Sequence, residues 1–139
     1  MTPPAPSDPP AGSAALRILL VDDSALFRSV LQQYLQPVTA AFLTADGGES
    51  ALALLEQTAV DVVISDLNMP GVDGIELVRR MRLHPQRSVR TLPAVLLTAE
   101  RDPELLAQAQ RAGADELVLK PIIPGELLSL VTRLCEVPS

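Results

Sequence analysis

Cysteine and long apolar runs are scarce in this 139-residue sequence. Their scarcity argues against a disulfide-linked or membrane-spanning protein. Cys135 is the single cysteine, so no disulfide can form within the chain, and a cytoplasmic location fits. No apolar run approaches the roughly 18–20 residues that a membrane-spanning helix needs. The N-terminus has no basic residue before Arg17 and no apolar stretch, which argues against a signal peptide. We therefore expect a protein without a membrane partner.

Basic residues are scarce as well. The sequence has 11 Lys and Arg against 17 Asp and Glu, which gives a formal net charge of −6. A surface that binds nucleic acid normally shows a basic stripe, so this balance disfavours direct nucleic-acid binding. The length predicts one domain, with enough chain to build a hydrophobic core.

The first residues differ in composition from the rest. Residues 2–15, TPPAPSDPPAGSAA, consist mainly of Pro, Ala and Ser and lack side chains that could pack into a core. We predict a disordered Pro-rich leader over residues 1–15 and a folded domain over residues 16–137. The spacing of Pro3, Pro6 and Pro9 also allows a second interpretation, a Pro-rich recognition ligand.

From Arg17 onward, short apolar runs alternate with longer helical patterns. Strands are predicted over 17–21, 40–45, 60–65, 92–98 and 115–120, and helices over 24–36, 48–57, 73–83, 102–113 and 124–136. This alternation is typical of an α/β, doubly wound, five-stranded parallel sheet with helices on both faces. Sites in such sheets lie beyond the carboxyl ends of the strands, where the strand order reverses. With the order 2-1-3-4-5, the first and third strands are neighbours at that point.

The predicted strands end in polar and charged side chains. Asp22 and Asp23 follow the first strand, Asp66 follows the third, Thr98 ends the fourth and Lys120 ends the fifth. Neighbouring carboxylates repel each other and resist burial unless something compensates them. Mg²⁺ takes oxygen ligands and keeps several waters, so it is the natural compensation. The sequence therefore predicts a magnesium site lined by three carboxylates, with a hydroxyl and an ammonium beside it.

Four stretches, LLVDDS, VVISDLNMPGVDGIEL, AVLLTA and GADELVLKP, follow one another within residues 17–136. Together and in this order they resemble the receiver domain of two-component response regulators, which implies the flavodoxin-like receiver fold. VDDSALFR is similar to the stand-alone, chemotaxis-type members. The sequence ends at CEVPS without an effector domain, so we expect a stand-alone receiver or one excised from a longer protein.

The resemblance implies a role for each carboxylate when it is carried over residue by residue. Asp66 would be the phosphoacceptor. Asp23 and Asp66 would bind Mg²⁺ (or Mn²⁺) directly, and Asp22 would act largely through a bound water. The carbonyl of Asn68 would be a further metal ligand.

The catalytic set implied by the resemblance is Asp66, Thr98 and Lys120. Thr98 would donate its hydroxyl to the phosphoryl group, Lys120 would pair with that group, and the Lys120–Pro121 bond would be cis. The protein would not be an enzyme acting on another substrate, since it would catalyse only its own Mg²⁺-dependent phosphorylation and dephosphorylation. Its implied partners are a sensor histidine kinase or histidine phosphotransfer protein and a downstream protein target.

Two other functions compete with this one. A degenerate receiver would make only phosphorylation-independent protein contacts, although retention of all the site residues argues against it. A metal-dependent phosphatase with an aspartate nucleophile usually has a second carboxylate two residues later. This chain has Asn68 after Asp66 and Ala25 after Asp23, so the phosphatase reading is weak.

Three residues have less specific interpretations. Phe27 has the helical spacing of a core residue, but it also lies one turn beyond the acid pair, where members of the family dock their kinase. His84 is the sole histidine and sits in the turn RLHPQRS, and we expect no catalytic role for it. Cys135 is expected to be a small packed residue.

Other positions bear on how the switch would work. Leu117 stands where many receivers have an aromatic residue that moves with Thr98, and Ile122 replaces a usual Phe. We expect a smaller rearrangement on the face formed by helix 102–113 and strand 115–120. Asn68 and Glu100 stand where family members tune the access of hydrolytic water, and their polar side chains predict a short-lived phosphoryl group.

Overall fold

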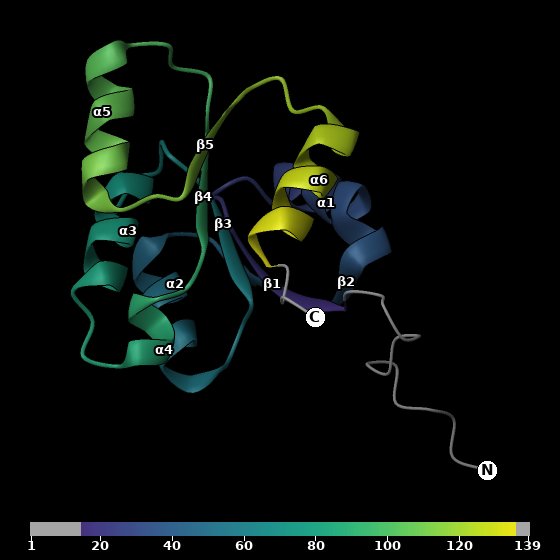
Figure 1. The fold of residues 1–139 in the computed structure, drawn as a ribbon, viewed down its shortest axis with the longest axis horizontal. Coiled ribbons are helices and arrows are strands. Elements are labelled where there is room, and N and C mark those ends of the chain that lie inside the picture. Colours follow the sequence, from purple (N-terminus) through teal and green to yellow (C-terminus); the bar gives the residue numbers. More distant parts are fainter. Residues whose placement is uncertain (1–14, 136–139) are drawn as a thin grey trace.

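The computed structural model describes residues 15–135, in which five parallel strands form one sheet (Figure 1). The strands are β1 (Leu16–Val21), β2 (Thr39–Ala45), β3 (Val62–Asp66), β4 (Ala94–Thr98) and β5 (Glu116–Leu119). The main helices are α1 (Ala25–Leu35), α2 (Gly48–Gln57), α3 (Gly74–Arg82), α5 (Pro103–Ala112) and α6 (Pro124–Leu134). No helix in residues 15–135 is long and apolar enough to cross a membrane. The predicted leader lies outside the described residues except for Ala15.

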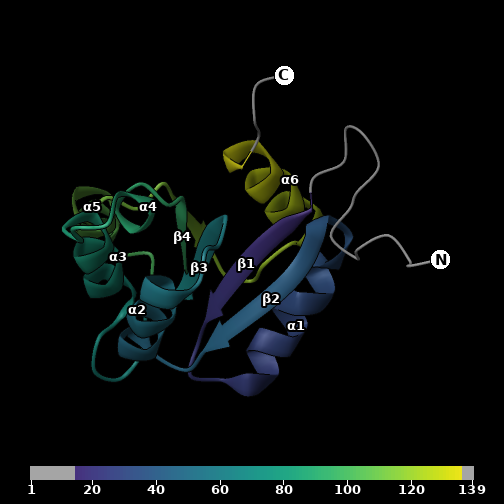
Figure 2. The same cartoon turned by 90° about the horizontal axis from the view of Figure 1, so that it is seen from below.

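The sheet has the order β2-β1-β3-β4-β5, and all four neighbouring pairs are parallel. The predicted doubly wound sheet and its strand order 2-1-3-4-5 are therefore confirmed. All residues of β3 and β4 are buried, as expected for central strands that are covered on both faces. The arrowheads of β1 and β2 point to the same edge of the sheet, where α1 begins (Figure 2).

Two hydrophobic clusters hold helices on the two faces of the sheet. Leu19, Val63 and Leu96 face the cluster that includes residues of α2, α3 and α5. Ile64 and Leu97 face the cluster that includes residues of α1 and α6. Successive strand residues point to opposite faces, so each apolar run serves both layers.

Short polar side chains begin three of the helices. The side chains of Ser24, Asp73 and Asp102 each accept a hydrogen bond from a backbone N–H in the first turn of α1, α3 and α5. Gly113 ends α5 with a positive φ of 107°, a conformation that favours glycine.

Two short helical turns differ from the prediction. The structure has α4 (Arg87–Arg90) in the connection between α3 and β4, where the sequence predicts only a turn around His84. A 3₁₀ turn, η1 (Gln36–Val38), joins α1 to β2. Four residues are too few to show helical periodicity, and Val89 is the one buried residue of α4.

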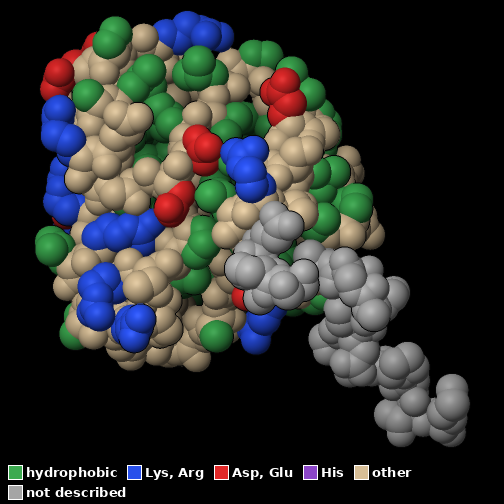
Figure 3. Space-filling model, in the orientation of Figure 1, with side chains coloured by type: hydrophobic (Ala, Val, Ile, Leu, Met, Phe, Trp, Pro, Cys, Tyr) green, Lys and Arg blue, Asp and Glu red, His purple; other side chains and the backbone are tan. Residues whose placement is uncertain are grey.

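Arginine side chains gather on the flank formed by α3 and α4 (Figure 3). Arg79, Arg80 and Arg82 lie in the last turn of α3, and Arg87 and Arg90 lie in α4. Because α3 returns from the carboxyl edge of the sheet to the amino edge, these cations lie at the opposite edge from the predicted acid cluster. These arginines therefore do not compensate the negative charge of that cluster.

Candidate functional site

The register of the sheet brings the polar strand ends together. β1 and β3 pair up to Val21 and Ser65, so the next residues, Asp22 and Asp66, end neighbouring strands. On the other side, β3 pairs with β4, and Thr98 ends that strand. Lys120, the first residue after β5, is the last of the polar residues at these strand ends. These positions share the carboxyl edge, where parallel α/β sheets place their sites.

Three carboxylates converge at this edge. Asp22, Asp23 and Asp66 each offer one oxygen, and these oxygens all lie within 4.8 Å of one another. Asp22 and Asp66 are buried, whereas Asp23 is exposed. The structure therefore brings the three predicted carboxylates into one cluster with an open side.

Asp22 has more negative than positive charge around it. Burial raises the pKa of the Asp22 carboxyl above its ordinary value, and the negative charges of Asp66 and Asp23 add to this effect. The Ser24 backbone N–H donates to Asp22 Oδ1 at 2.8 Å and, together with the Lys120 ammonium, favours the ionised form. Burial and the neighbouring negative charges outweigh these two contributions. The Asp22 carboxylate therefore lacks enough nearby positive charge and hydrogen-bond donors to offset its burial.

Asp66 has a direct partner in Lys120. The Lys120 Nζ lies 3.0 Å from Asp66 Oδ1, with 29% of the lysine side chain and 11% of the aspartate side chain exposed. The backbone N–H of Lys120 donates to the Thr98 carbonyl at 2.8 Å, which fixes the start of the side chain beside β4. The Lys120–Pro121 bond is cis, as the resemblance implies.

Thr98 and Asn68 lie beside this group in different surroundings. Thr98 is fully buried, and its Oγ1 accepts a hydrogen bond from the Glu100 backbone N–H at 2.9 Å. That bond uses the hydroxyl oxygen and leaves the hydroxyl hydrogen available for another acceptor. Asn68 follows Asp66 by two residues, and its side chain is exposed, as is that of Glu100.

The segment after β3 is held tightly behind Asp66. The Leu67 N–H donates to the Leu97 carbonyl at 2.8 Å, and the Gly74 N–H donates to the Leu67 carbonyl at 2.9 Å. A Cβ on Gly74 would lie 2.5 Å from the carbonyl oxygen of Asp66. A residue larger than glycine at position 74 would therefore displace the backbone that carries the central carboxylate.

The donor set fits Mg²⁺. Carboxylate oxygens are the hard ligands that this ion prefers, and the cluster is open at Asp23, where water ligands have room. Three carboxylates face one ammonium, and burial already disfavours the charge on Asp22. A divalent cation would relieve both repulsion and desolvation.

Two contacts at this edge were not expected from the sequence. The Phe27 ring, half-buried in α1, has its centroid 4.5 Å from Lys120 Nζ. Arg28 donates from Nη1 to the backbone carbonyl of Asp22. Both residues fall in the first turn and a half of a capped helix that starts directly behind the acid pair, and that placement is the signal that could have identified them.

His84 and Cys135 lie apart from the carboxyl edge. His84 Nε2 lies 2.9 Å from Glu56 Oε2, and its Nδ1 accepts from the Gln86 N–H at 3.0 Å. Burial, helped by the charge of Asp61, raises the pKa of the Cys135 thiol to about 11. The thiol is therefore protonated near neutral pH and packs against the α1/α6 cluster, as expected for a small packed residue.

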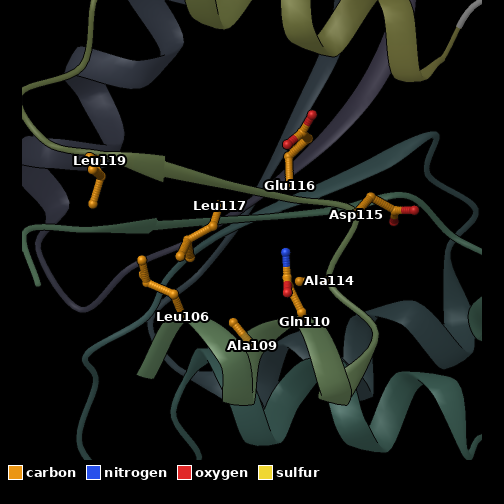
Figure 4. Close-up of a pocket in the computed structure, with 8 residues that line it drawn as sticks. All are labelled: Leu106, Ala109, Gln110, Ala114, Asp115, Glu116, Leu117 and Leu119. Atoms are coloured by element: carbon orange, nitrogen blue, oxygen red, sulfur yellow. The ribbon is translucent and has the colours of Figure 1, made fainter. Parts of the chain in front are cut away.

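A hollow of about 290 Å³ lies between α5 and β5 (Figure 4). Leu117 of β5 is half-buried and points toward Leu106 of α5. The hollow is lined by Leu106, Ala109, Gln110, Ala114, Asp115, Glu116, Leu117 and Leu119. Leu117 therefore places an aliphatic side chain where many receivers have an aromatic ring.

A family model matches most of the chain. Residues 18–132 match the response regulator receiver domain. The sensory/regulatory protein RpfC of Xanthomonas campestris pv. campestris is 32% identical over 120 residues, which are 86% of this chain and 16% of that protein. The chain thus spans less than a fifth of that relative's length.

Solved structures share the architecture. The chemotaxis protein CheY4 of Vibrio cholerae is 35% identical, with a TM-score of 0.78 and coverage of 87% of this chain and 99% of that one. The receiver domain of a sensor histidine kinase from Pseudomonas aeruginosa PAO1 is 25% identical, with a TM-score of 0.78 and coverage of 89% and 100%. That structure holds a magnesium ion in its active site cleft.

Proposed function

This chain belongs to the response regulator receiver domains of two-component signalling, and we propose that it is a phosphorylatable switch with Asp66 as its phosphoacceptor. The observation that carries the proposal is the contact of Asp66 with Lys120 beside the acid pair Asp22 and Asp23. Asp66 is buried beside one ammonium and two further carboxylates. It can receive an anionic phosphoryl group only when additional positive charge is supplied.

The proposed reaction moves a phosphoryl group from a phosphohistidine to Asp66. A carboxylate oxygen of Asp66 attacks phosphorus, and the P–N bond breaks as the new P–O bond forms. The imidazole leaves with the electron pair of that bond and takes up a proton. Water later attacks the aspartyl phosphate, which releases inorganic phosphate and restores the carboxylate. Lys120 lies where its ammonium can compensate the charge that gathers on the phosphoryl oxygens.

Asp22, Asp23, Asp66 and the carbonyl of Asn68 would hold Mg²⁺ in this proposal. Once bound, the ion would supply the charge neutralisation that lets a carboxylate and a phosphoryl group approach each other. The magnesium ion of the related receiver from Pseudomonas aeruginosa supports this assignment. Asp23 is the exposed member of the three carboxylates, so it keeps the site in contact with solvent.

Thr98 is proposed to transmit the modification. Its hydroxyl hydrogen would be donated to a phosphoryl oxygen once Asp66 is modified. Because Thr98 Oγ1 also accepts the N–H of Glu100, a movement of Thr98 would pull on the loop between β4 and α5. The face formed by α5 and β5 would then present the signal to a downstream protein.

The proposed phosphoryl donors are a sensor histidine kinase or a histidine phosphotransfer protein. Relatives of this chain include a sensory/regulatory protein and the receiver of a sensor histidine kinase, which supports this choice. The downstream target is proposed to be a protein rather than nucleic acid, given the net charge of −6. A cytoplasmic location is part of the same proposal.

Labelling by a small phosphodonor tests the phosphoacceptor. We expect the wild-type protein to be phosphorylated by acetyl phosphate with Mg²⁺, and Asp66→Asn to fold but to remain unlabelled. Asp46→Asn is the matched control, since Asp46 is an exposed carboxylate in the loop before α2, and it should be labelled like the wild type. Strong, hydroxylamine-resistant labelling of Asp66→Asn would overturn the assignment.

Binding of beryllofluoride, a phosphoryl analogue, separates the switch from a receiver that makes only phosphorylation-independent contacts. A switch should bind beryllofluoride only when Mg²⁺ is present, with shifts in the NMR resonances of Asp66 and Thr98. Absence of both binding and labelling would support the interaction module instead.

A further inference from the structure

Lys120 has a second neighbour whose role the proposed function does not include. Its Nζ lies 3.0 Å from Asp66 Oδ1 and 4.5 Å from the centroid of the Phe27 ring. It is the only lysine in the sequence. Its side chain is long, flexible and 29% exposed, so contact with Asp66 alone leaves it several other conformations.

The Phe27 ring is a firmly held surface beside the Lys120 side chain. The backbone N–H of Phe27 donates to Ser24 Oγ at 3.1 Å, which anchors the first turn of α1. The ring is half-buried and packs against the cluster between the sheet, α1 and α6. The anchored helix turn and the packed ring together hold the aromatic face in place beside the Lys120 ammonium.

An aromatic face is suited to hold an ammonium that must stay reactive. The electron-rich face of the ring attracts a cation without carrying a net charge. A carboxylate in the same place would take an N–H donor and part of the positive charge away from Asp66. With Phe27, the Lys120 ammonium keeps its donors for Asp66 and for the phosphoryl oxygens.

We propose that Phe27 is a positioning residue for phosphoryl transfer, whose ring face holds the Lys120 ammonium beside Asp66. The inference rests on the proposed function, because it assigns Phe27 a task within that reaction. Phe27 acts through Lys120 and has no contact with the phosphoryl donor in this account. This positioning role is distinct from the core packing of the ring and from the kinase docking that the sequence left as an alternative.

An NMR measurement tests the contact without any phosphorylation. Selective ¹³C labelling of lysine gives one Cε–Hε resonance, since Lys120 is the sole lysine. The nearby ring should displace this resonance upfield. Phe27→Leu should remove the displacement, whereas Phe27→Tyr, which keeps a ring, should retain it. Phe42→Leu is the matched control, because Phe42 packs against the same cluster from β2.

Rates with acetyl phosphate and Mg²⁺ test the consequence, and this small donor removes any effect of kinase docking. Phe27→Leu should slow phosphorylation by roughly 3- to 10-fold. Phe27→Tyr and Phe42→Leu should stay within about two-fold of the wild type. In a Lys120→Met background, Phe27→Leu should cause no further loss, because the ring then has no ammonium to hold.

The outcomes separate this inference from the proposed function. An unshifted lysine resonance, or an equal rate loss from Phe27→Leu with and without Lys120, would overturn the positioning role while Asp66 remains the phosphoacceptor. An unchanged rate in Phe27→Leu would overturn it as well. A wild-type protein that is never phosphorylated would overturn the proposed function, and the positioning role with it.

Discussion

Arg82 at the amino edge of the sheet and the acid cluster at the carboxyl edge are both charged groups, but their charges are balanced to different degrees. At the amino edge, Arg82 of α3 donates to four oxygens at 2.7 to 3.0 Å: the carbonyls of Arg90, Leu92 and Gly113 and the carboxylate of Asp115. The same Asp115 oxygen also accepts the Ala94 N–H at 2.8 Å. This network joins α3, α4, the end of α5 and the starts of β4 and β5.

At the carboxyl edge, negative charge exceeds positive charge. Asp22, Asp23 and Asp66 crowd within 4.8 Å, and Lys120 is the ammonium paired with Asp66. The cation at the amino edge has acceptors for its donors, whereas the carboxylates at the carboxyl edge lack sufficient positive charge. We therefore expect the Arg82 network to stabilise the fold, and the cluster of Asp22, Asp23 and Asp66 to bind a cation.

The largest effect is expected from breaking the amino-edge network. Arg82→Met should lower the free energy of unfolding by about 2 kcal/mol, because it leaves three backbone carbonyls without their donor and removes the partner of the exposed Asp115 carboxylate. Arg80→Met is the matched control on the same helix. Arg80 pairs with Glu76 on the surface, and its loss should cost about 0.5 kcal/mol or less. Urea unfolding of the two variants measures the difference, and equal losses would contradict it.

A medium effect is expected from adding Mg²⁺. At about ten times the dissociation constant, Mg²⁺ should stabilise the wild type by about 1.4 kcal/mol through mass action. Asp23→Ala should remove most of this gain while leaving the metal-free melting temperature equal or higher. Asp115→Ala should show the reverse, a lower metal-free melting temperature with the Mg²⁺ gain intact. A large metal-free loss in Asp23→Ala would show that Asp23 is structural.

A smaller effect concerns pH in the absence of metal. The pKa of Asp22 is raised in the folded protein, mainly by burial. Its contribution to stability is therefore present below the ordinary carboxyl pKa of about 4 and is lost as pH rises through the raised value. Asp22→Asn keeps an oxygen for the Ser24 N–H but cannot ionise. It should be slightly more stable than the wild type at pH 7 and should flatten the pH dependence.

The pH prediction is checked by metal-free unfolding of the wild type and of Asp22→Asn. A wild-type and an Asp22→Asn curve that run parallel from pH 4 to pH 7 would contradict the cause given for Asp22.

The smallest effect on the site itself is expected at Leu117. A tyrosine there would meet the hollow between α5 and β5 (Figure 4), and Asp66 is not among the residues that line this hollow. Leu117→Tyr should leave phosphorylation rates within about two-fold while altering partner affinity or self-association. Rates with acetyl phosphate and sedimentation of the beryllofluoride form measure both properties. A strong rate change without any change in association would place residue 117 in the packing of the site.

Much of the fold and of the acid cluster at the carboxyl edge could be predicted from the sequence. The parallel sheet followed from alternating apolar runs, and its order 2-1-3-4-5 was assumed as one that doubly wound sheets adopt. The grouping of Asp22, Asp23 and Asp66 followed from the strand ends, since parallel strands share one edge. Phosphoacceptor and metal-ligand roles came from the resemblance, and they stay predictions.

The amino-edge network and the Phe27 contact were not predictable in the same way. Arg82 reaches Asp115 across 33 residues, and a pairing of two ordinary surface-type residues at that separation has no local pattern. Phe27 had the spacing of a core residue, and its ring contact depends on where the Lys120 side chain lies after the sheet has formed. α4 was missed because a single turn carries no periodicity.

The most direct test of the central claim is to locate the phosphoryl group itself. The protein is treated with acetyl phosphate with and without Mg²⁺, reduced with borohydride to trap aspartyl phosphate, and mapped by peptide mass spectrometry. We expect modification at Asp66, dependent on Mg²⁺, with Asp22 and Asp23 unmodified. Modification at either of those two carboxylates, or labelling of Asp66 that is equally strong without Mg²⁺, would contradict this claim.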